Sequence, residues 1–277
     1  MIVDLEAWRA REAAHQHRVD VWVQPHLERR HRGEKHPVHD FLFTYYSHRP
    51  SALRRWHPGY GVDLVGGSNP ATVTLLAQRR PLIERIRRLL VATASRSPTL
   101  GCFGLHEWAM VHRTDATRHD WPLRLGPAGT DTVVESHRIA CSHFDAFRFF
   151  TPSARPLNTL HPSRDDREAL EQPGCLHAGM DLYKHAFRLS PLIASELVAD
   201  AFELAWDIRI MDMRAAPYDL SGLVLDPSGE EWTPVKIETP EGKREYADRQ
   251  RHYSERGGPI RQRLIDECER LLSATEA

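Results

Sequence analysis

Long apolar runs are absent from this chain of 277 residues. No stretch approaches the roughly 18 uninterrupted apolar residues that a membrane-spanning helix needs. The segment Met1 to Arg11 is charged, and the apolar core of a secretory signal does not follow it. We therefore expect neither secretion nor membrane insertion, and we expect a cytoplasmic protein. With 41% hydrophobic residues, the chain is long enough to bury a real core.

Cysteine is scarce and scattered. The four cysteines, Cys102, Cys141, Cys175 and Cys268, lie far apart in the sequence and form no Cys-x-x-Cys pair. This spacing argues against a zinc knuckle, a thioredoxin-like motif and a secreted disulfide scaffold. We expect all four thiols to be reduced.

Motifs of several large enzyme classes are missing as well. The sequence has no Gly-x-Gly-x-x-Gly, no Walker loop and no Gly-x-Ser-x-Gly elbow, which argues against dinucleotide enzymes, P-loop NTPases and α/β-hydrolases. His106-Glu107 resembles the start of the zincin motif His-Glu-x-x-His, but Met110 stands where the second histidine would be.

Lysine is rare, whereas arginine and histidine are abundant. Only four of the 37 basic residues are lysines, which leaves 33 arginines. Arginine suits phosphate and carboxylate binding, although a GC-rich genome explains its abundance equally well. The 17 histidines are harder to explain by codon usage. Because imidazole titrates and binds metals near neutral pH, they raise the expectation of chemistry.

The hydrophobic periodicity predicts a mainly α protein, a compact helical domain with a small β-hairpin or sheet. Helices are expected over residues 4–32, 36–49, 51–56, 81–94, 103–113, 176–189, 191–214 and 241–272, the last of them interrupted at Gly257-Gly258-Pro259. β-branched residues alternate with polar ones around residues 131–150 and predict the hairpin there. We expect one domain over residues 1–277, made of an N-terminal helical arm (1–57), a mixed segment of helix, hairpin and proline-rich loop (58–174), and a helical core (175–277).

Acidic residues form a stripe on the expected helix 191–214. Glu196, Asp200, Glu203 and Asp207 follow spacings of four, three and four residues, so they share one face of a helix. One interpretation is a solvated acidic face, and the other is a buried carboxylate cluster that needs partners.

The preceding helix offers such partners. Asp181 and His185 form an i,i+4 pair, and His177 lies one turn before Asp181. Two antiparallel helices would let this pair face the carboxylates. The arrangement predicts either a general acid and base, or a His/carboxylate metal site for iron, manganese or zinc held by His177, Asp181 and His185.

The segment of residues 143–156 combines aromatic residues with two arginines and a rigid loop that contains two prolines. Phe144, Arg148 and Arg155 belong to this segment, and aromatic stacking beside arginine–phosphate contacts is what an unstacked nucleotide requires. A core strand that leads into a surface loop is the alternative interpretation.

Four strings in the chain are long enough to be specific for a family. They are His-Asp-Phe-Leu-Phe-Thr-Tyr-Tyr-Ser-His-Arg-Pro (39–50), Gly-Leu-His-Glu-Trp-Ala-Met-Val (104–111), His-Phe-Asp-Ala-Phe-Arg-Phe-Phe-Thr-Pro (143–152) and Asp-Met-Arg-Ala-Ala-Pro-Tyr-Asp-Leu (212–220). Through them nearly the whole chain resembles an actinobacterial family commonly labelled 3-methyladenine DNA glycosylase.

The resemblance implies a hydrolase of DNA repair that excises an alkylated purine from DNA or a nucleoside and needs no cofactor. A carboxylate would activate water or stabilise the oxocarbenium-like sugar. We assign this catalytic role to Asp181, Glu203 or Asp207, with His185 assisting. Substrate binding is assigned to a further set of side chains: His106, Glu107, Phe144, Arg148, Arg155 and Tyr183.

Two other functions remain open from the sequence. In the first, a metal-dependent enzyme holds iron, manganese or zinc with His177, Asp181 and His185 and acts on a small molecule. In the second, the acidic stripe is the surface of a binding protein. The sequence leaves the oligomeric state open.

Overall fold

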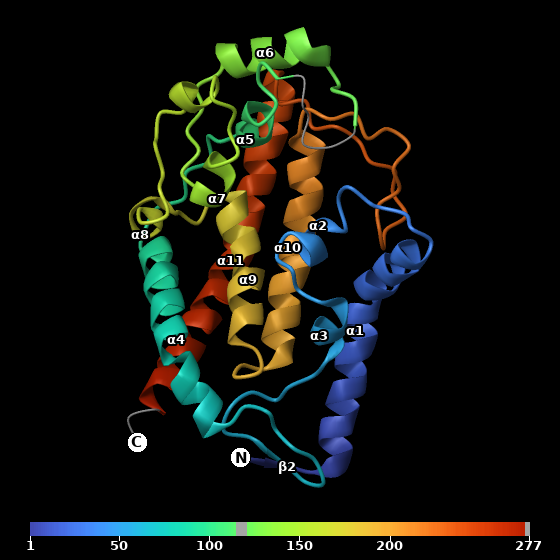
Figure 1. Cartoon of the computed structure of the whole chain (residues 1–277), viewed down its shortest axis with the longest axis vertical. Helices are drawn as coiled ribbons and strands as arrows, with labels where there is room; N and C mark the ends of the chain where they lie inside the picture. Colours follow the sequence, from blue (N-terminus) through green and yellow to red (C-terminus); the bar gives the residue numbers. More distant parts are fainter. Residues whose placement is uncertain (115–120, 275–277) are drawn as a thin grey trace. The chain divides into compact units, whose positions relative to one another are not determined.

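The computed structural model, shown in Figure 1, describes residues 1–114 and 121–274 and confirms the mainly α fold. Its α-helices are α1 (Leu5–His31), α2 (Phe41–Thr44), α3 (Pro50–Arg54), α4 (Val73–Ala94), α5 (Leu105–Ala109), α6 (Gly126–Ser136), α7 (Phe144–Phe147), α8 (Arg167–Leu170), α9 (Leu176–Leu189), α10 (Ser195–Ala215) and α11 (Pro240–Ser273). A 3₁₀ turn, η1, covers Arg155–Leu157, and the strands are β1 (Ile2–Val3) and β2 (Asp63–Leu64). None of the described helices has the length and apolar character to cross a membrane.

The contacts of the chain group into two compact units. Unit 1 consists of Met1–Val91, Met180–Trp206 and Gly257–Ala277, and unit 2 of Ala92–Gly179 and Asp207–Arg256. The helices α4, α9, α10 and α11 contribute residues to both units. The expectation of one domain over residues 1–277 stays a prediction.

Unit 1 is built on the long helix α1. Asp4 starts the helix as its N-cap, because its side chain accepts a hydrogen bond of 2.8 Å from the backbone N–H of Ala7. The apolar side of α1 is buried, and the ring centroid of Trp22 lies 5.6 Å from that of Phe202. Tyr183 packs edge-on against Phe202 at 4.9 Å, so aromatic rings fill the core of this unit.

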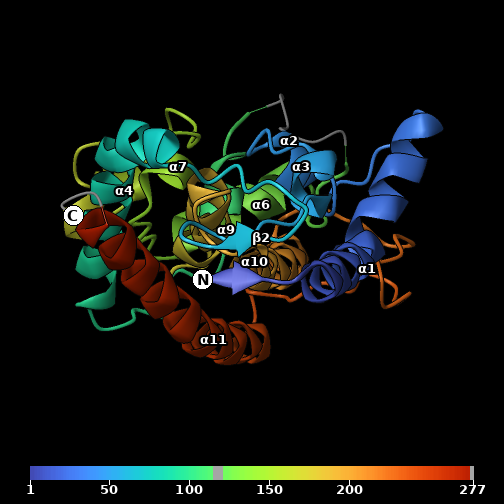
Figure 2. The same cartoon turned by 90° about the horizontal axis from the view of Figure 1, so that it is seen from below.

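The small sheet also belongs to unit 1. Strands β1 and β2 pair in parallel, with Ile2 opposite Asp63 and Val3 opposite Leu64, as Figure 2 shows near the N-terminus. A small sheet is therefore present, but its position and direction differ from the predicted hairpin.

The hairpin predicted around residues 131–150 is wrong. Residues 126–136 form helix α6 in unit 2, and α7 begins at Phe144. The β-branched residues Val133 and Val134 are buried in α6, so burial against the rest of the unit overrides their preference for strands. Within residues 137–143, Ile139 contributes an isolated bridge to Asn158.

Several predicted helices also differ from the structure, since α4 begins at Val73 and not at residue 81, and α5 is shorter than the predicted 103–113. The helix expected over residues 36–49 shrinks to α2, and the break expected near Gly257 in the last helix does not occur. A Cβ atom added to Gly257 would lie 3.6 Å from both Leu182 and Leu204 within unit 1, which is ordinary contact. This glycine therefore lies against the core without breaking the helix.

Unit 1 keeps three buried histidines neutral. Burial lowers the pKa of His15, and burial together with the charges of nearby basic groups lowers the pKa of His48 and His57 to about 4. The Nε2–H of His15 donates to the carbonyl oxygen of Leu53 at 2.8 Å, and this hydrogen bond opposes the effect of burial on the pKa without cancelling it.

These histidines predict a loss of stability in acid. An unfolded histidine has a pKa of about 6.5, so between pH 6.5 and 4 the unfolded state binds more protons than the folded state. Stability therefore falls as the pH falls through this window, by at most about 1.4 kcal/mol per pH unit for each group.

We expect His57→Gln to make this decline shallower, as measured by urea unfolding at pH 7, 6, 5 and 4. The matched control His252→Gln removes an exposed histidine and should leave the slope unchanged. Equal slopes for the wild type and His57→Gln would contradict the assignment.

Candidate functional site

The short helix α5 places His106 and Glu107 in the interior of unit 2. It begins after Gly104, whose φ of +70° lies in the left-handed region that glycine adopts at little cost. A Cβ atom there would lie 3.2 Å from the Cβ of Ala215. The indole N–H of Trp108 donates to the carbonyl oxygen of Ala215 at 2.8 Å. The close approach of the Gly104 backbone to Ala215 and this hydrogen bond hold α5 against the end of α10.

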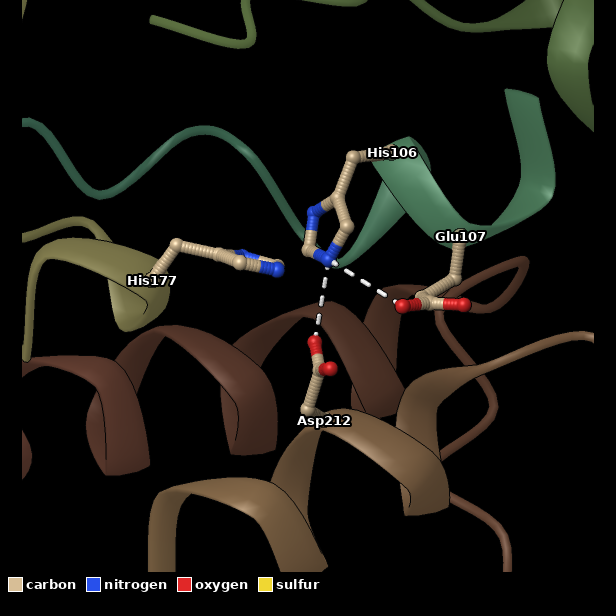
Figure 3. Close-up of side chains that lie close together, drawn as sticks. All are labelled: His106, Glu107, His177 and Asp212. Atoms are coloured by element: carbon tan, nitrogen blue, oxygen red, sulfur yellow. Dashed lines mark hydrogen bonds and ion pairs between the residues drawn. The ribbon is translucent and has the colours of Figure 1, made fainter. Parts of the chain in front are cut away.

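A buried hydrogen-bonded ion pair joins α5 to α10. The Nε2 atom of His106 lies 3.0 Å from Oδ1 of Asp212, and both side chains are almost completely buried (Figure 3). Burial alone lowers the pKa of His106, but the charge and hydrogen bond of Asp212 outweigh burial and raise this pKa well above its usual range. Burial alone raises the pKa of Asp212, but the charges of His106, His177 and Arg209 hold it well below its usual range.

Arg209 and Glu107 complete a network of buried charges. Arg209 donates from Nη1 to Oδ2 of Asp212 at 3.0 Å, and the same nitrogen lies 3.8 Å from Oε1 of Glu107. Glu107 Oε1 also lies 3.9 Å from His106 Nε2. Two acidic side chains therefore lie beside one guanidinium and one imidazolium in the interior of unit 2, where buried charges need partners.

Two further histidines extend this network. The ring of His177, in the first turn of α9, lies edge-on to the ring of His106 at a centroid distance of 4.6 Å. The ring of His143 lies 5.4 Å from the ring of His177, and His143 Nε2 is 3.5 Å from Oε1 of Glu171. His106, His177 and His143 are thus joined by successive ring contacts, and this row of imidazoles contacts Asp212 through His106 and Glu171 through His143.

A cavity of about 220 Å³ lies beside this row within unit 2. Its wall includes seven side chains that carry reactive or titratable groups: Arg96, Cys102, Cys141, Cys175, His106, His177 and Tyr246. Cys102 Sγ lies 3.6 Å from Nδ1 of His106, and the three thiols are free. Burial raises the pKa of Cys141, Cys175 and Tyr246. The cavity therefore presents neutral thiols and a neutral phenol to a ligand, together with the positive charges of Arg96 and His106.

The structure brings together three of the predicted site residues, namely His106, Glu107 and His177. Asp181, Tyr183 and His185 belong to unit 1, where Tyr183 is part of the aromatic core and His185 is buried. Asp181 accepts a hydrogen bond of 3.0 Å from the hydroxyl of Tyr46 and contacts Nζ of Lys184. The joint metal site of His177, Asp181 and His185 stays a prediction.

The acidic stripe of α10 is engaged in ion pairs with arginines. In unit 1, Arg18 contacts both Asp200 and Glu203, and Arg11 binds Glu196. In unit 2, Arg256 lies 2.7 Å from Asp207. About two fifths of the side-chain surface of Glu203 and of Asp207 is exposed, which favours the interpretation of a solvated face. A catalytic role for these two carboxylates stays a prediction.

The aromatic and basic segment lies at the surface of unit 2. Arg148 and Arg155 are exposed, whereas Phe144 is half-buried at the start of α7. The guanidinium of Arg148 lies 4.5 Å from the ring centre of Phe149, and Arg155 donates to the carbonyl oxygen of Arg148 at 3.3 Å. The guanidinium of Arg155 thus lies at the backbone of Arg148, and the guanidinium of Arg148 itself lies 3.5 Å from Oδ1 of Asp145.

Asp212, Arg209 and the three cysteines that line the cavity were not among the site residues predicted from the sequence. Arg209 and Asp212 form an i,i+3 pair of opposite charge in the middle of an otherwise apolar stretch of α10. That pattern was a usable signal. Nothing in the sequence spacing indicated that Cys102, Cys141 and Cys175 would line one cavity.

Comparison with known proteins gives no relatives: no family model, no curated protein and no solved structure matches this chain.

Removing one member of the buried pair should be costly. We expect Asp212→Ala to lower the free energy of unfolding by about 3–5 kcal/mol, because it leaves His106 and Arg209 buried without their carboxylate. Chemical denaturation of the metal-free protein measures this change.

The matched control is Asp248→Ala, which removes an exposed partner of Arg251 and should cost less than about 1 kcal/mol. Similar losses in the two variants would contradict the importance of the buried network.

Proposed function

We propose that unit 2 carries the centre of a metal-dependent enzyme, in which His106, Glu107, His177 and Asp212 bind a divalent cation. The observation that carries this proposal is the convergence of four donor atoms, one from each residue, all within 4.8 Å of one another. All four residues are buried, and they come from three separate helices (Figure 3).

The donor chemistry supports a particular class of metal. Two imidazoles and two carboxylates are the ligands that iron(II), manganese(II) and zinc prefer, whereas calcium and magnesium prefer oxygen alone. The combination of two histidines with a carboxylate and further open positions is typical of non-haem iron enzymes. We therefore rank iron first, with manganese and zinc as alternatives.

Burial of the charges also supports the proposal. Each buried charge costs several kcal/mol of desolvation, and well-packed apolar residues in place of a buried ion pair are often as stable or more stable. Without a metal, the imidazolium of His106 neutralises one carboxylate. Because a ligating imidazole must be neutral, a cation would displace the His106 proton and take over its charge.

The surrounding residues would orient both the ligands and the substrate. Arg209 holds Asp212 through its second oxygen, Oδ2, which leaves Oδ1 facing His106. His106 and His177 line the cavity of about 220 Å³, so a small molecule inside this cavity would lie beside the metal. A bound metal would supply Lewis-acid or redox chemistry to that molecule.

Metal content tests this proposal without knowledge of the substrate. We expect the purified, untagged protein to contain near-stoichiometric iron, manganese or zinc by inductively coupled plasma mass spectrometry. His177→Gln and Asp212→Asn should each lose most of it while the far-ultraviolet circular dichroism is unchanged.

His252→Gln is the control, because it removes an exposed histidine outside the cluster and should retain the metal. A wild-type protein that stays metal-free, and whose melting temperature does not rise when iron(II), manganese(II) or zinc is added under reducing conditions, would overturn the proposal.

A second function, the excision of alkylated purines, is supported by the exposed pair Arg148 and Arg155 beside Phe149. For this function we expect release of free methylated purine from alkylated DNA. Replacing both arginines with alanine should reduce the slope of log affinity against log salt by about 2, because two phosphate contacts are lost. An unchanged slope, or no release of base, would rule out this second function.

A further inference from the structure

A second cavity, of about 410 Å³, lies entirely within unit 1. The end of α1, the turn that follows it and the segment around α2 form its wall. The side chains that matter here are His26, Arg30, Lys35, Phe43, His48 and Arg49. We call this cavity the basic groove. It shares no residue with the proposed metal centre.

The carboxylates of the basic groove are already neutralised. Asp40 accepts hydrogen bonds from Nδ1 of His26 at 2.7 Å and from the backbone N–H of His36 at 2.8 Å, and Arg29 pairs with it as well. Glu34 accepts two hydrogen bonds from the guanidinium of Arg32. Neither carboxylate therefore cancels the charge of the basic residues that line the groove.

Three cationic side chains at the groove have no such partner. Arg30, Lys35 and Arg49 are exposed, and none of them forms an ion pair with a described residue. They gather around one concave site and do not follow an extended track. A compact anion with more than one negative charge satisfies three cations at once, whereas a polynucleotide backbone needs a continuous basic path.

The imidazole of His48 supplies an unsatisfied polar atom in the same wall. Its side chain is 7% exposed, and Nδ1 has no hydrogen-bond partner among the described residues. The ring stacks on Phe187 at a centroid distance of 3.8 Å, which fixes its plane. Burial, with the charges of Arg188 and Lys184, lowers the pKa of His48 to about 4, so the ring is neutral at pH 7. Leaving such an atom unpaired is costly, and a ligand that bonds it removes the cost.

We propose that the basic groove binds a small phosphomonoester, such as a nucleoside monophosphate. The dianionic phosphate is bound by Arg30, Lys35 and Arg49, and the organic part lies against His48 and Phe43. A phosphomonoester carries nearly two negative charges at pH 7 and three strong acceptor oxygens, which matches the three free cations. The volume of the groove is that of an ordinary small-ligand site.

The test is isothermal titration calorimetry of the full chain with adenosine 5′-monophosphate, inorganic phosphate and adenosine. We expect saturable binding of the monophosphate, weaker binding of phosphate and none of adenosine. Arg49→Gln and Lys35→Gln should each lower the affinity for the monophosphate by about tenfold, because each removes a charge-assisted hydrogen bond.

The matched control is Arg85→Gln, which removes an exposed arginine of α4 in the same unit and should change the affinity less than twofold. His48→Leu should also weaken binding by about tenfold. Because Arg49 and Lys35 are exposed, their variants keep the test decisive even if the buried His48 variant does not fold.

Three results would overturn the proposal. One is the absence of saturable binding of both the monophosphate and phosphate, and another is an affinity that Arg49→Gln and Lys35→Gln leave unchanged. The third is binding of an oligonucleotide without a terminal phosphate as tightly as the monophosphate, with a loss of affinity in Arg49→Gln and Lys35→Gln. That result would assign the groove to a phosphodiester backbone.

Discussion

The buried contact between His106 and Asp212 constrains the rest of unit 2. The two residues are 106 positions apart in the sequence, and their ring nitrogen and carboxylate oxygen meet at 3.0 Å in an interior that excludes water. A separated imidazolium and carboxylate would each pay a large desolvation cost there. The chain must therefore hold α5 firmly against α10, which the hydrogen bond from Trp108 to Ala215 and the close contact at Gly104 accomplish.

The same residue type takes opposite protonation states in the two units. In unit 2, a buried carboxylate raises the pKa of His106, whereas in unit 1 burial beside basic groups lowers the pKa of His48 and His57. The neighbouring charges decide the outcome, because burial alone favours the neutral ring in both places. The charged network of unit 2 is compatible with the proposed cation site. The neutral ring of His48 is compatible with the proposed anion site in the basic groove of unit 1. The many histidines of this chain thus serve different purposes.

Several elements could be predicted because their signals are local. The limits of α9 agree with the prediction because Leu176 to Leu189 has a clear apolar face, and the acidic stripe of α10 follows from helical spacing. The hairpin failed because Val133 and Val134 favour strands locally but are buried in a helix. The site was predicted in part: His106, Glu107 and His177 were singled out, but they were assigned to separate roles.

By itself the sequence determined that the chain is mainly helical, rich in histidine and arginine, and equipped with acidic and imidazole groups at helical spacing. Only the tertiary structure decided that Asp212 is the partner of His106 and that three distant cysteines line one cavity. The physical reason is that helical periodicity reports which face a side chain occupies, whereas a charge interaction depends on the distance and the dielectric between two faces. Those quantities arise only when the helices pack.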